Sequence, residues 1–218
     1  MIFTGRKLTR PARRRFHGDG VVGGLLIALV VIGALLAPWL PLPDPLTNNL
    51  VAMFQPPGSD GHLLGTDQLG RDLLARILSG ARLSLMVVLI AAAIAAVIGT
   101  LLGMLAGYLG GWVDALIMRL MDIQLAVPFI LLILLVMALF GTTLSNIIVI
   151  MGVTSWAIYA RVARAKTLEI RELEYIEAVK AMGFSTPRIL LRHVLPNLAT
   201  PLVVLLTLDI PRLIVLEA

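Results

Sequence analysis

Three ionisable residues interrupt the last long apolar stretch of the chain, Leu198 to Glu217, and are the first candidates for chemistry. If this stretch crosses a membrane, its charged side chains are costly and mark pathways, gates or paired groups. Asp209 and Arg212 are three residues apart, a helical spacing at which they can neutralise each other. Glu217 has no evident partner in the sequence, so it is the carboxylate with more scope for a role of its own.

The other polar side chains form no catalytic or metal-binding pattern. The sequence has no GxxxxGK[ST] phosphate-binding loop, so nothing in this chain is expected to hydrolyse ATP. Its histidines, His17, His62 and His193, are far apart and have no second ligand at metal-binding spacing. The absence of cysteine excludes disulfides, thiolate metal sites and cysteine nucleophiles. We therefore expect no catalytic residue, no metal site and no cofactor bound by this chain.

The composition predicts an integral membrane protein. Of 218 residues, 59% are hydrophobic and only 14% are charged, and the mean hydropathy is +0.96. A soluble domain of this size could not bury so much apolar surface. The net charge of +5 is compatible with nucleic-acid binding, but the basic residues flank apolar stretches and form no soluble, aromatic-studded face. No nucleic acid is expected as a partner.

Five apolar stretches are long enough, at about 1.5 Å per residue, to cross or nearly cross a hydrocarbon core of about 30 Å. They are Val21 to Ala37, Leu83 to Leu109, Ile123 to Phe140, Leu144 to Ala160, and Leu198 to about Glu217. Their unbroken runs of leucine, valine and alanine do not alternate as the strands of a membrane barrel do. The predicted fold class is all-α, a polytopic bundle of membrane-spanning helices.

The distribution of lysine and arginine predicts the orientation of the spans. Basic residues are concentrated in the tail, residues 1–20, and again in residues 161–196, so both segments are expected in the cytoplasm. The first span, residues 21–38, then leads to an extracytoplasmic segment, residues 39–82. A secretory signal with an Arg13-Arg14 pair is the alternative for the first span. In either case the later spans hold the protein in the membrane as a multi-pass chain.

A polar and basic loop, EAVKAMGFSTPRILLRHVLP, occupies residues 177–196 between two apolar stretches. We expect a helix over residues 175–182, a stop at Gly183, and a second helix that is capped by Ser185 or Thr186 and begins at the next proline. The closing proline of the loop is expected to mark the return of the chain to the bilayer. A loop of this kind can be held by a cytoplasmic partner.

The loop resembles the EAA loop of binding-protein-dependent ABC importer permeases, which has Glu-Ala-Ala, a glycine six residues after the glutamate, and a closing Leu-Pro. The matching residues are Glu177, Ala178, Gly183, Leu195 and Pro196. Val179 replaces the second alanine, and His193 stands where many members have isoleucine. The resemblance implies that Glu177 and Ala178 contact a separate ATPase subunit, that Gly183 permits the turn, and that Pro196 fixes the entry of the fifth span.

Residues 62–85, HLLGTDQLGRDLLARILSGARLSL, resemble an extracytoplasmic motif of the C-type subunit of dipeptide and oligopeptide permeases. The motif residues are Gly65, Thr66, Asp67, Gly70, Arg71, Asp72, Arg76, Gly80 and Arg82. From the residues themselves, we expect Asp67 to cap an amphipathic helix that lies at the membrane interface before the second span.

A third stretch, AGYLGGWVDALIMRLMDIQLAVPFILL at residues 106–132, is similar to the same subfamily. Within it, Arg119 and Asp122 are at helical i, i+3 spacing and are predicted to form a structural ion pair. Pro128 is predicted to kink the third span, which neighbouring helices in a membrane tolerate.

The resemblance implies the MetI-like fold of type I ABC importer permeases, with residues 83–218 as its transmembrane domain and a coupling loop at about 161–196. Five spans are present of an expected six, so the sequence is expected to be a fragment, a truncated product or a variant without its last helix. The family has a Leu-Glu-Ala at the place of residues 216–218. This implies that Glu217 lines or gates the substrate route.

The function implied is that of a permease subunit of an ATP-driven importer of di- or oligopeptides in the cytoplasmic membrane. Its partners would be a second related permease subunit, two ATPase subunits that bind ATP and Mg, an extracytoplasmic substrate-binding protein, peptide substrate and membrane lipids. The same machinery could carry nickel or glutathione. An ion-coupled transporter acting alone and a membrane scaffold are alternatives of other classes, and dependence on an ATPase would separate them from the importer.

Overall fold

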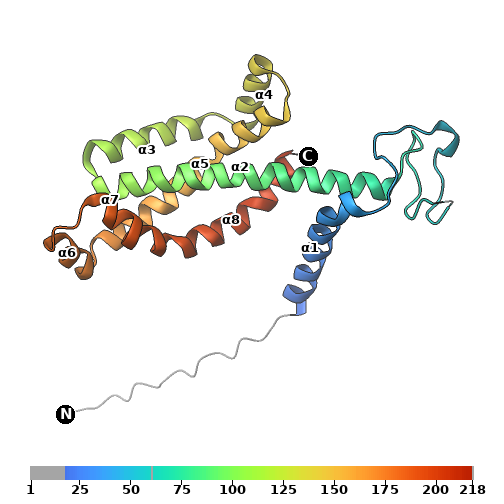
Figure 1. Ribbon diagram of the computed structural model, residues 1–218. Coiled ribbons are helices and arrows are strands. Elements are labelled where there is room, and N and C mark those ends of the chain that lie inside the picture. Colours follow the sequence, from blue (N-terminus) through green and yellow to red (C-terminus); the bar gives the residue numbers. More distant parts are fainter. Residues whose placement is uncertain (1–17, 60, 218) are drawn as a thin grey trace, which may run out of the picture. The chain divides into compact units, whose positions relative to one another are not determined.

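The computed structural model describes residues 18–59 and 61–217 (Figure 1). Within these residues every extended regular element is a helix, and strand-like pairing is limited to two isolated bridges, Ser59 with His62 and Thr66 with Asp72. The all-α prediction is confirmed. Most of the predicted basic tail lies outside the described residues. The chain divides into two compact units, residues 1–82 and 83–218.

The first unit contains the helix α1 (Gly18–Leu36), the short 3-10 turns η1 (Ala37–Trp39) and η2 (Leu50–Ala52), and the beginning of α2. From Val21 to Leu36 the side chains of α1 are apolar and most of them are exposed, as expected of a helix that faces lipid. The lack of a side chain at Gly33 lets α1 pack closely against Leu78 of α2, because a Cβ at this position would lie 2.9 Å from Leu78 Cδ2.

The helix α2 runs without interruption from Leu73 to Leu109. The amphipathic helix expected before the second span begins at Leu73 and continues directly into that span, so its residues form the first turns of one long helix. Its place at a membrane interface stays a prediction. The sequence contains no proline here, and an isolated glycine such as Gly80 costs a helix only about 1 kcal/mol. The cap is also five residues later than predicted, at Asp72 instead of Asp67: Asp72 Oδ1 accepts a hydrogen bond from the Ala75 N–H at 2.7 Å.

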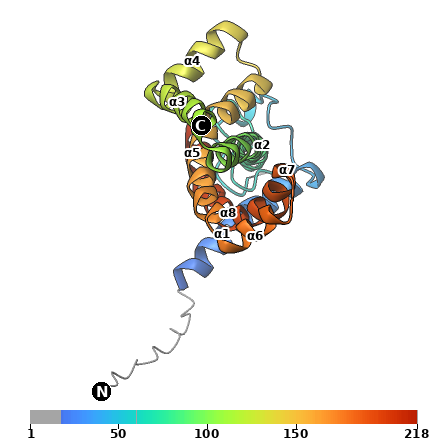
Figure 2. The same cartoon turned by 90° about the vertical axis from the view of Figure 1, so that its left-hand side faces the viewer.

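The second unit continues α2 from Leu83 and adds the remaining helices. They are α3 (Gly111–Ala126), α4 (Phe129–Phe140), α5 (Leu144–Arg171), α6 (Glu174–Ala181), α7 (Thr186–Ile189), the π-helical turn η3 (Leu190–Val194) and α8 (Leu195–Glu217). Figure 2 looks along α2 and shows α5 and α8 beside it. Their shared core includes Val87, Ala91, Met151 and Leu213.

Three glycines on one face of α2 allow α5 to approach at backbone distance. Gly99, Gly103 and Gly107 are four residues apart, and a Cβ at Gly103 would collide with the carbonyl oxygen of Ala160. A Cβ at Gly107 would lie 2.8 Å from the Arg164 carbonyl oxygen. Small residues at this spacing let membrane helices pack closely, and here they fix α2 against α5.

The third predicted span is broken rather than kinked. The helices α3 and α4 meet at 86° across Val127 and Pro128. Val127 has extended backbone (φ −91°, ψ 126°), as the residue before a proline prefers, and Pro128 has no N–H to continue the helix. Among residues 18–59 and 61–217, four helices are long and apolar enough to cross a membrane, or five spans are present if this bent pair forms one of them.

The chain from Thr186 to Glu217 is one continuous helical rod of 32 residues. Pro196 therefore does not separate the loop from the last span, contrary to the prediction. In a regular α-helix its ring would crowd the carbonyl of Arg192. The wider π-helical turn η3 lies directly ahead of it, and the Leu195 N–H bonds to the carbonyl of Leu190, five residues back.

Candidate functional site

The loop at residues 177–196 is built from two helical pieces joined at Gly183. The first, α6, ends where Gly183 adopts φ +80°, a left-handed conformation that glycine takes at little cost. The Gly183 N–H bonds to the Lys180 carbonyl at 2.9 Å, and the Phe184 N–H reaches the Val179 carbonyl at 3.4 Å. The predicted helix and stop agree with this to within one residue.

Ser185 occupies the N-cap of the second piece, but its side chain makes no capping hydrogen bond. Its carbonyl instead accepts from the Ile189 N–H at 3.1 Å. Pro187 lies in the first turn, where its missing N–H has no helical partner to lose. The sequence thus located the start of this helix correctly, although a backbone group rather than a hydroxyl closes the first turn.

An apolar cluster packs the loop against the C-terminal halves of α2 and α5. Its fully buried members come from six elements: Met104, Ala163, Ile170, Ile176, Val179, Ile189, Leu190, Val194 and Leu198. Leu195 is partly buried against them. Glu177, Ala178 and Pro196 are exposed, so the loop buries one side and presents the motif carboxylate on the other. Lys180 adds a contact to α2, with its ammonium 5.2 Å from the centre of the Tyr108 ring.

Two arginines in the C-terminal part of α5 join this helix to α2 and α3 through hydrogen bonds and an ion pair. Arg171 Nη1 donates to the carbonyls of Gly107 (3.0 Å) and Tyr108 (3.4 Å), which belong to the last turn of α2. These carbonyls have no intrahelical partner, and a cation beside them also complements the helix dipole. Arg164 makes a bidentate ion pair with Asp114 of α3, at 2.5 and 2.6 Å.

The sequence did not predict either arginine contact, because each joins residues at least 50 positions apart. The one usable signal was a basic residue in the last turn of α5. The predicted ion pair of Arg119 with Asp122 is not formed: the ion pairs of the described residues do not include it, and Asp114 supplies the α3 carboxylate that is paired. Arg119 is exposed.

His193 lies between two aromatic rings of the loop. Its ring centre is 6.3 Å from that of Tyr175 and 6.4 Å from that of Phe184. It therefore joins α6 to η3 through ring packing. Across the described residues, no three His, Asp or Glu side chains come together as a metal ion would require.

A second polar group lies between α5 and α8. Asp209 is only 4% exposed and Tyr159 is fully buried, and the Tyr159 hydroxyl donates to Asp209 Oδ2 at 3.0 Å. Arg212 Nη1 donates to Asp209 Oδ1 at 3.3 Å, so the predicted neutralisation of these two charges is present. Tyr159 was not predicted, because its partner is 50 residues away.

Glu217 has a partner that the sequence did not reveal. The Ser84 hydroxyl donates to Glu217 Oε2 at 2.7 Å and so joins the last turn of α8 to α2. Both residues are partly buried. Whether Glu217 lines or gates a route stays a prediction, but its position at a helix–helix contact is fixed.

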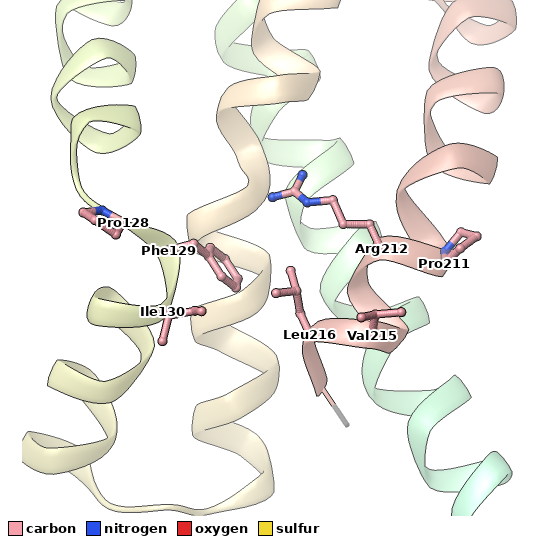
Figure 3. A pocket seen from close by; sticks show the side chains of 7 residues that line it. All are labelled: Pro128, Phe129, Ile130, Pro211, Arg212, Val215 and Leu216. Carbon is pink, nitrogen blue, oxygen red and sulfur yellow. The ribbon is translucent and has the colours of Figure 1, made fainter.

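A cavity of about 590 Å³ lies beside Arg212, and we call it the Arg212 cavity. Its walls are Pro128, Phe129, Ile130, Pro211, Arg212, Val215 and Leu216. Figure 3 shows the Arg212 guanidinium reaching from α8 towards the α3–α4 break. Arg212 also lines a smaller neighbouring cavity of about 180 Å³, together with Gln124 and Thr154. It is the one charged residue on the walls of these two described cavities.

Residues of the second motif, predicted to be extracytoplasmic, form a compact hydrogen-bonded turn in the first unit. Asp67 accepts from the N–H groups of Leu69 (2.8 Å) and Arg71 (3.0 Å) and from Arg71 Nε (2.8 Å), and it also pairs with Arg76. Burial alone would raise the pKa of the Asp67 carboxyl, but the Arg71 and Leu69 N–H groups and the Arg71 guanidinium outweigh it. The pKa therefore lies well below its ordinary value.

The other motif residues divide into two sets. In the first set, the Thr66 hydroxyl accepts from the Gln55 N–H at 2.9 Å, and Asp72 Oδ2 lies 2.8 Å from His62 Nδ1. Two buried glycines in the same set allow backbone segments to approach closely. These glycines are Gly65 and Gly70, both with positive φ. Gly80 and Arg82, by contrast, are exposed on α2 and take no part in this turn.

The described residues form a bundle of apolar helices with a two-helix loop packed on its core, an architecture suited to a membrane permease, and the family comparison identifies the class. Residues 99–218 match the model of binding-protein-dependent transport system inner membrane components. The chain belongs to this family and is a permease component of an ABC importer.

Individual relatives match almost the whole chain. OppC, the oligopeptide transport system permease protein of Escherichia coli (strain K12), is 42% identical over 98% of this chain and 72% of its own length. A putative peptide transport system permease protein of Brucella suis biovar 1 is 39% identical over all of this chain and 71% of the relative. OppC of Bacillus subtilis is 36% identical over 97% of this chain and 70% of the relative.

Proposed function

We propose that this permease subunit carries short peptides across the cytoplasmic membrane, together with a second related permease subunit. In this arrangement an extracytoplasmic binding protein delivers the peptide, and two separate ATPase subunits, which bind ATP and Mg, supply the energy. The N-terminus and the loop around Gly183 face the cytoplasm.

The substrate class rests on the relatives, which are named as oligopeptide, di/tripeptide or peptide permease proteins. These names favour peptides over the nickel or glutathione that the same machinery could carry. Family membership likewise favours an ATP-driven importer over an ion-coupled transporter or a scaffold.

The observation that carries the proposal is the two-sided construction of the loop. One side buries Ile176, Val179 and Ile189 in a cluster shared with α2, α5 and α8. The other side leaves Glu177 and Ala178 exposed. A partner that moves the exposed side therefore moves the helices beneath it, because close-packed side chains transmit displacement rather than absorbing it.

Co-purification tests the ATPase contact. The chain is co-expressed with its partner permease and ATPase subunits, and the complex is purified in detergent. We expect the ATPase to co-elute with the native chain and to be lost when the exposed charge is reversed by Glu177→Lys. The matched control is Glu172→Lys, at an exposed residue before α6. Retention of the ATPase by Glu177→Lys, with normal uptake of peptide, would contradict the proposed contact.

Coupling is tested separately at Gly183. A leucine here must adopt φ +80°, which costs a side-chain-bearing residue roughly 1–2 kcal/mol, so Gly183→Leu should distort the turn between α6 and α7. We expect ATP hydrolysis to continue while peptide uptake falls about tenfold or more, measured in proteoliposomes. Gly183→Asn is the control, because asparagine tolerates the left-handed conformation, and it should keep most of the uptake. Normal coupling in Gly183→Leu would count against the hinge.

A further inference from the structure

The Arg212 cavity combines one cation with walls that are otherwise apolar. Pro128, Phe129, Val215 and Leu216 surround a guanidinium whose side chain is 44% exposed. At about 1.5 Å per residue, Arg212 lies about 21 Å along α8 from Leu198, in the half of the span remote from the cytoplasmic loop. Charged groups inside spans face the interior or a pathway. Although Arg212 pairs with Asp209, its guanidinium remains on the cavity wall.

Asp209, the partner of Arg212 within the chain, occupies only part of the hydrogen-bonding capacity of the guanidinium. A guanidinium has five N–H donors, and among the described residues Arg212 donates one hydrogen bond, the 3.3 Å contact to Asp209. Asp209 is itself buried and is shared with the Tyr159 hydroxyl. The remaining donors are directed from α8 towards the α3–α4 break (Figure 3).

We propose that the Arg212 cavity is a carboxylate-binding site on the substrate route, where the C-terminal carboxylate of a peptide in transit binds the guanidinium. This inference rests on the proposed function, since it takes a peptide as the substrate. The planar guanidinium matches a carboxylate with two parallel hydrogen bonds, and in a cavity of low polarity such a pair is stronger than in water. The apolar walls accept the side chains of the peptide.

The opposite wall is compatible with an anion. Pro128, Phe129 and Ile130 form the N-terminal end of α4, where the first N–H groups have no intrahelical partners and no side chain caps them. This end adds a weak positive potential to the one that Arg212 supplies. Arg212 remains the group that carries the proposal, because its charge and its donors lie on the cavity wall itself.

The test compares tri-alanine with its C-terminal amide, which lacks the negative charge. Both radiolabelled peptides are bound to the purified complex of this chain with its partner subunits, without the binding protein, and measured by equilibrium dialysis. We expect the native complex to bind the acid at least about tenfold more tightly than the amide, the effect of one charge-assisted hydrogen-bonded pair. Arg212→Gln should equalise the two affinities by weakening the acid alone, and Arg212→Lys should keep part of the preference.

Arg119→Gln is the charge-matched control, because Arg119 is exposed on α3 and lines neither described cavity. It should retain the native preference. Equal affinities of the native complex for acid and amide, failure of the acid to bind, or a preference that survives Arg212→Gln would overturn the carboxylate site. Uptake of tri-alanine by the native complex with its binding protein is measured in parallel. If uptake occurs but the preference does not, only this inference fails; if uptake is absent, the proposed function fails with it.

Discussion

Single side chains tie together elements that are far apart in the sequence. Arg171 donates to a carbonyl in the last turn of α2, the Tyr159 hydroxyl donates to Asp209 on α8, and the Ser84 hydroxyl donates to Glu217. None of these partners could be read from local spacing, since a helical pattern relates only residues three or four positions apart. The one local pair that the spacing did predict correctly, Asp209 with Arg212, lies at that separation.

Asp67 gives the first residue-scale prediction. Its lowered pKa means that the ionised carboxylate stabilises the motif turn at every pH above the ordinary carboxyl value of 3.8, and that this stability is lost as the pH falls below it. Asp67→Asn removes the charge at neutral pH and should loosen the turn in the same way. We expect faster hydrogen exchange at the amides of Leu69 and Arg71, measured by mass spectrometry at pH 7.

The control for this prediction is Asp44→Asn. Asp44 is exposed and bonds only within its own turn, to the Leu46 N–H and the Thr47 hydroxyl. It should leave exchange at Leu69 and Arg71 unchanged. Equal exchange in the native chain and Asp67→Asn would show that the carboxylate does not hold the turn.

At the scale of elements, the glycine face of α2 decides how closely two spans pack. Gly103→Ala places a methyl group on the Ala160 backbone, and such overpacking costs about 1–3 kcal/mol. We expect a lower thermal midpoint for the purified protein in detergent. Gly80→Ala on the same helix meets open space within its unit, so it should leave the midpoint unchanged or raise it slightly. An equal effect of both changes would contradict close α2–α5 packing.

The apolar pattern predicted the existence and approximate position of the spans, and turn chemistry predicted the hinge at Gly183. Both are local properties. The pattern failed where one proline can act in different ways. At Pro128 the helix is broken by an 86° bend, whereas at Pro196 the helix continues because the turn before it is π-helical. Whether a proline breaks its helix depends on whether the turn before it can widen and remain packed. The sequence of that turn before Pro196, LLRHV, does not reveal this by itself.

At the scale of the whole molecule, the placement of basic residues predicts which parts face the cytoplasm. The native sequence has no cysteine, so single reporters can be introduced without background labelling. Ser185→Cys should react with a membrane-impermeant maleimide only in inside-out vesicles, and Val51→Cys only in intact spheroplasts. Both positions are exposed, Val51 by 96%. Labelling of both cysteines from one side would contradict the predicted topology.

The helical segment from Thr186 to Glu217 connects the loop to Arg212 without a break at Pro196. Between Thr186 and Arg212 it measures about 39 Å at 1.5 Å per residue. If the helix moved as a rigid body, a tilt of about 5° at its loop end would displace the guanidinium of Arg212 by about 3 Å, roughly the length of a hydrogen bond. Pro196 does not divide the helix, but Pro201 and Pro211 lie within it, so two turns without a backbone N–H donor lie between the loop and Arg212 and set how much of the tilt reaches that side chain.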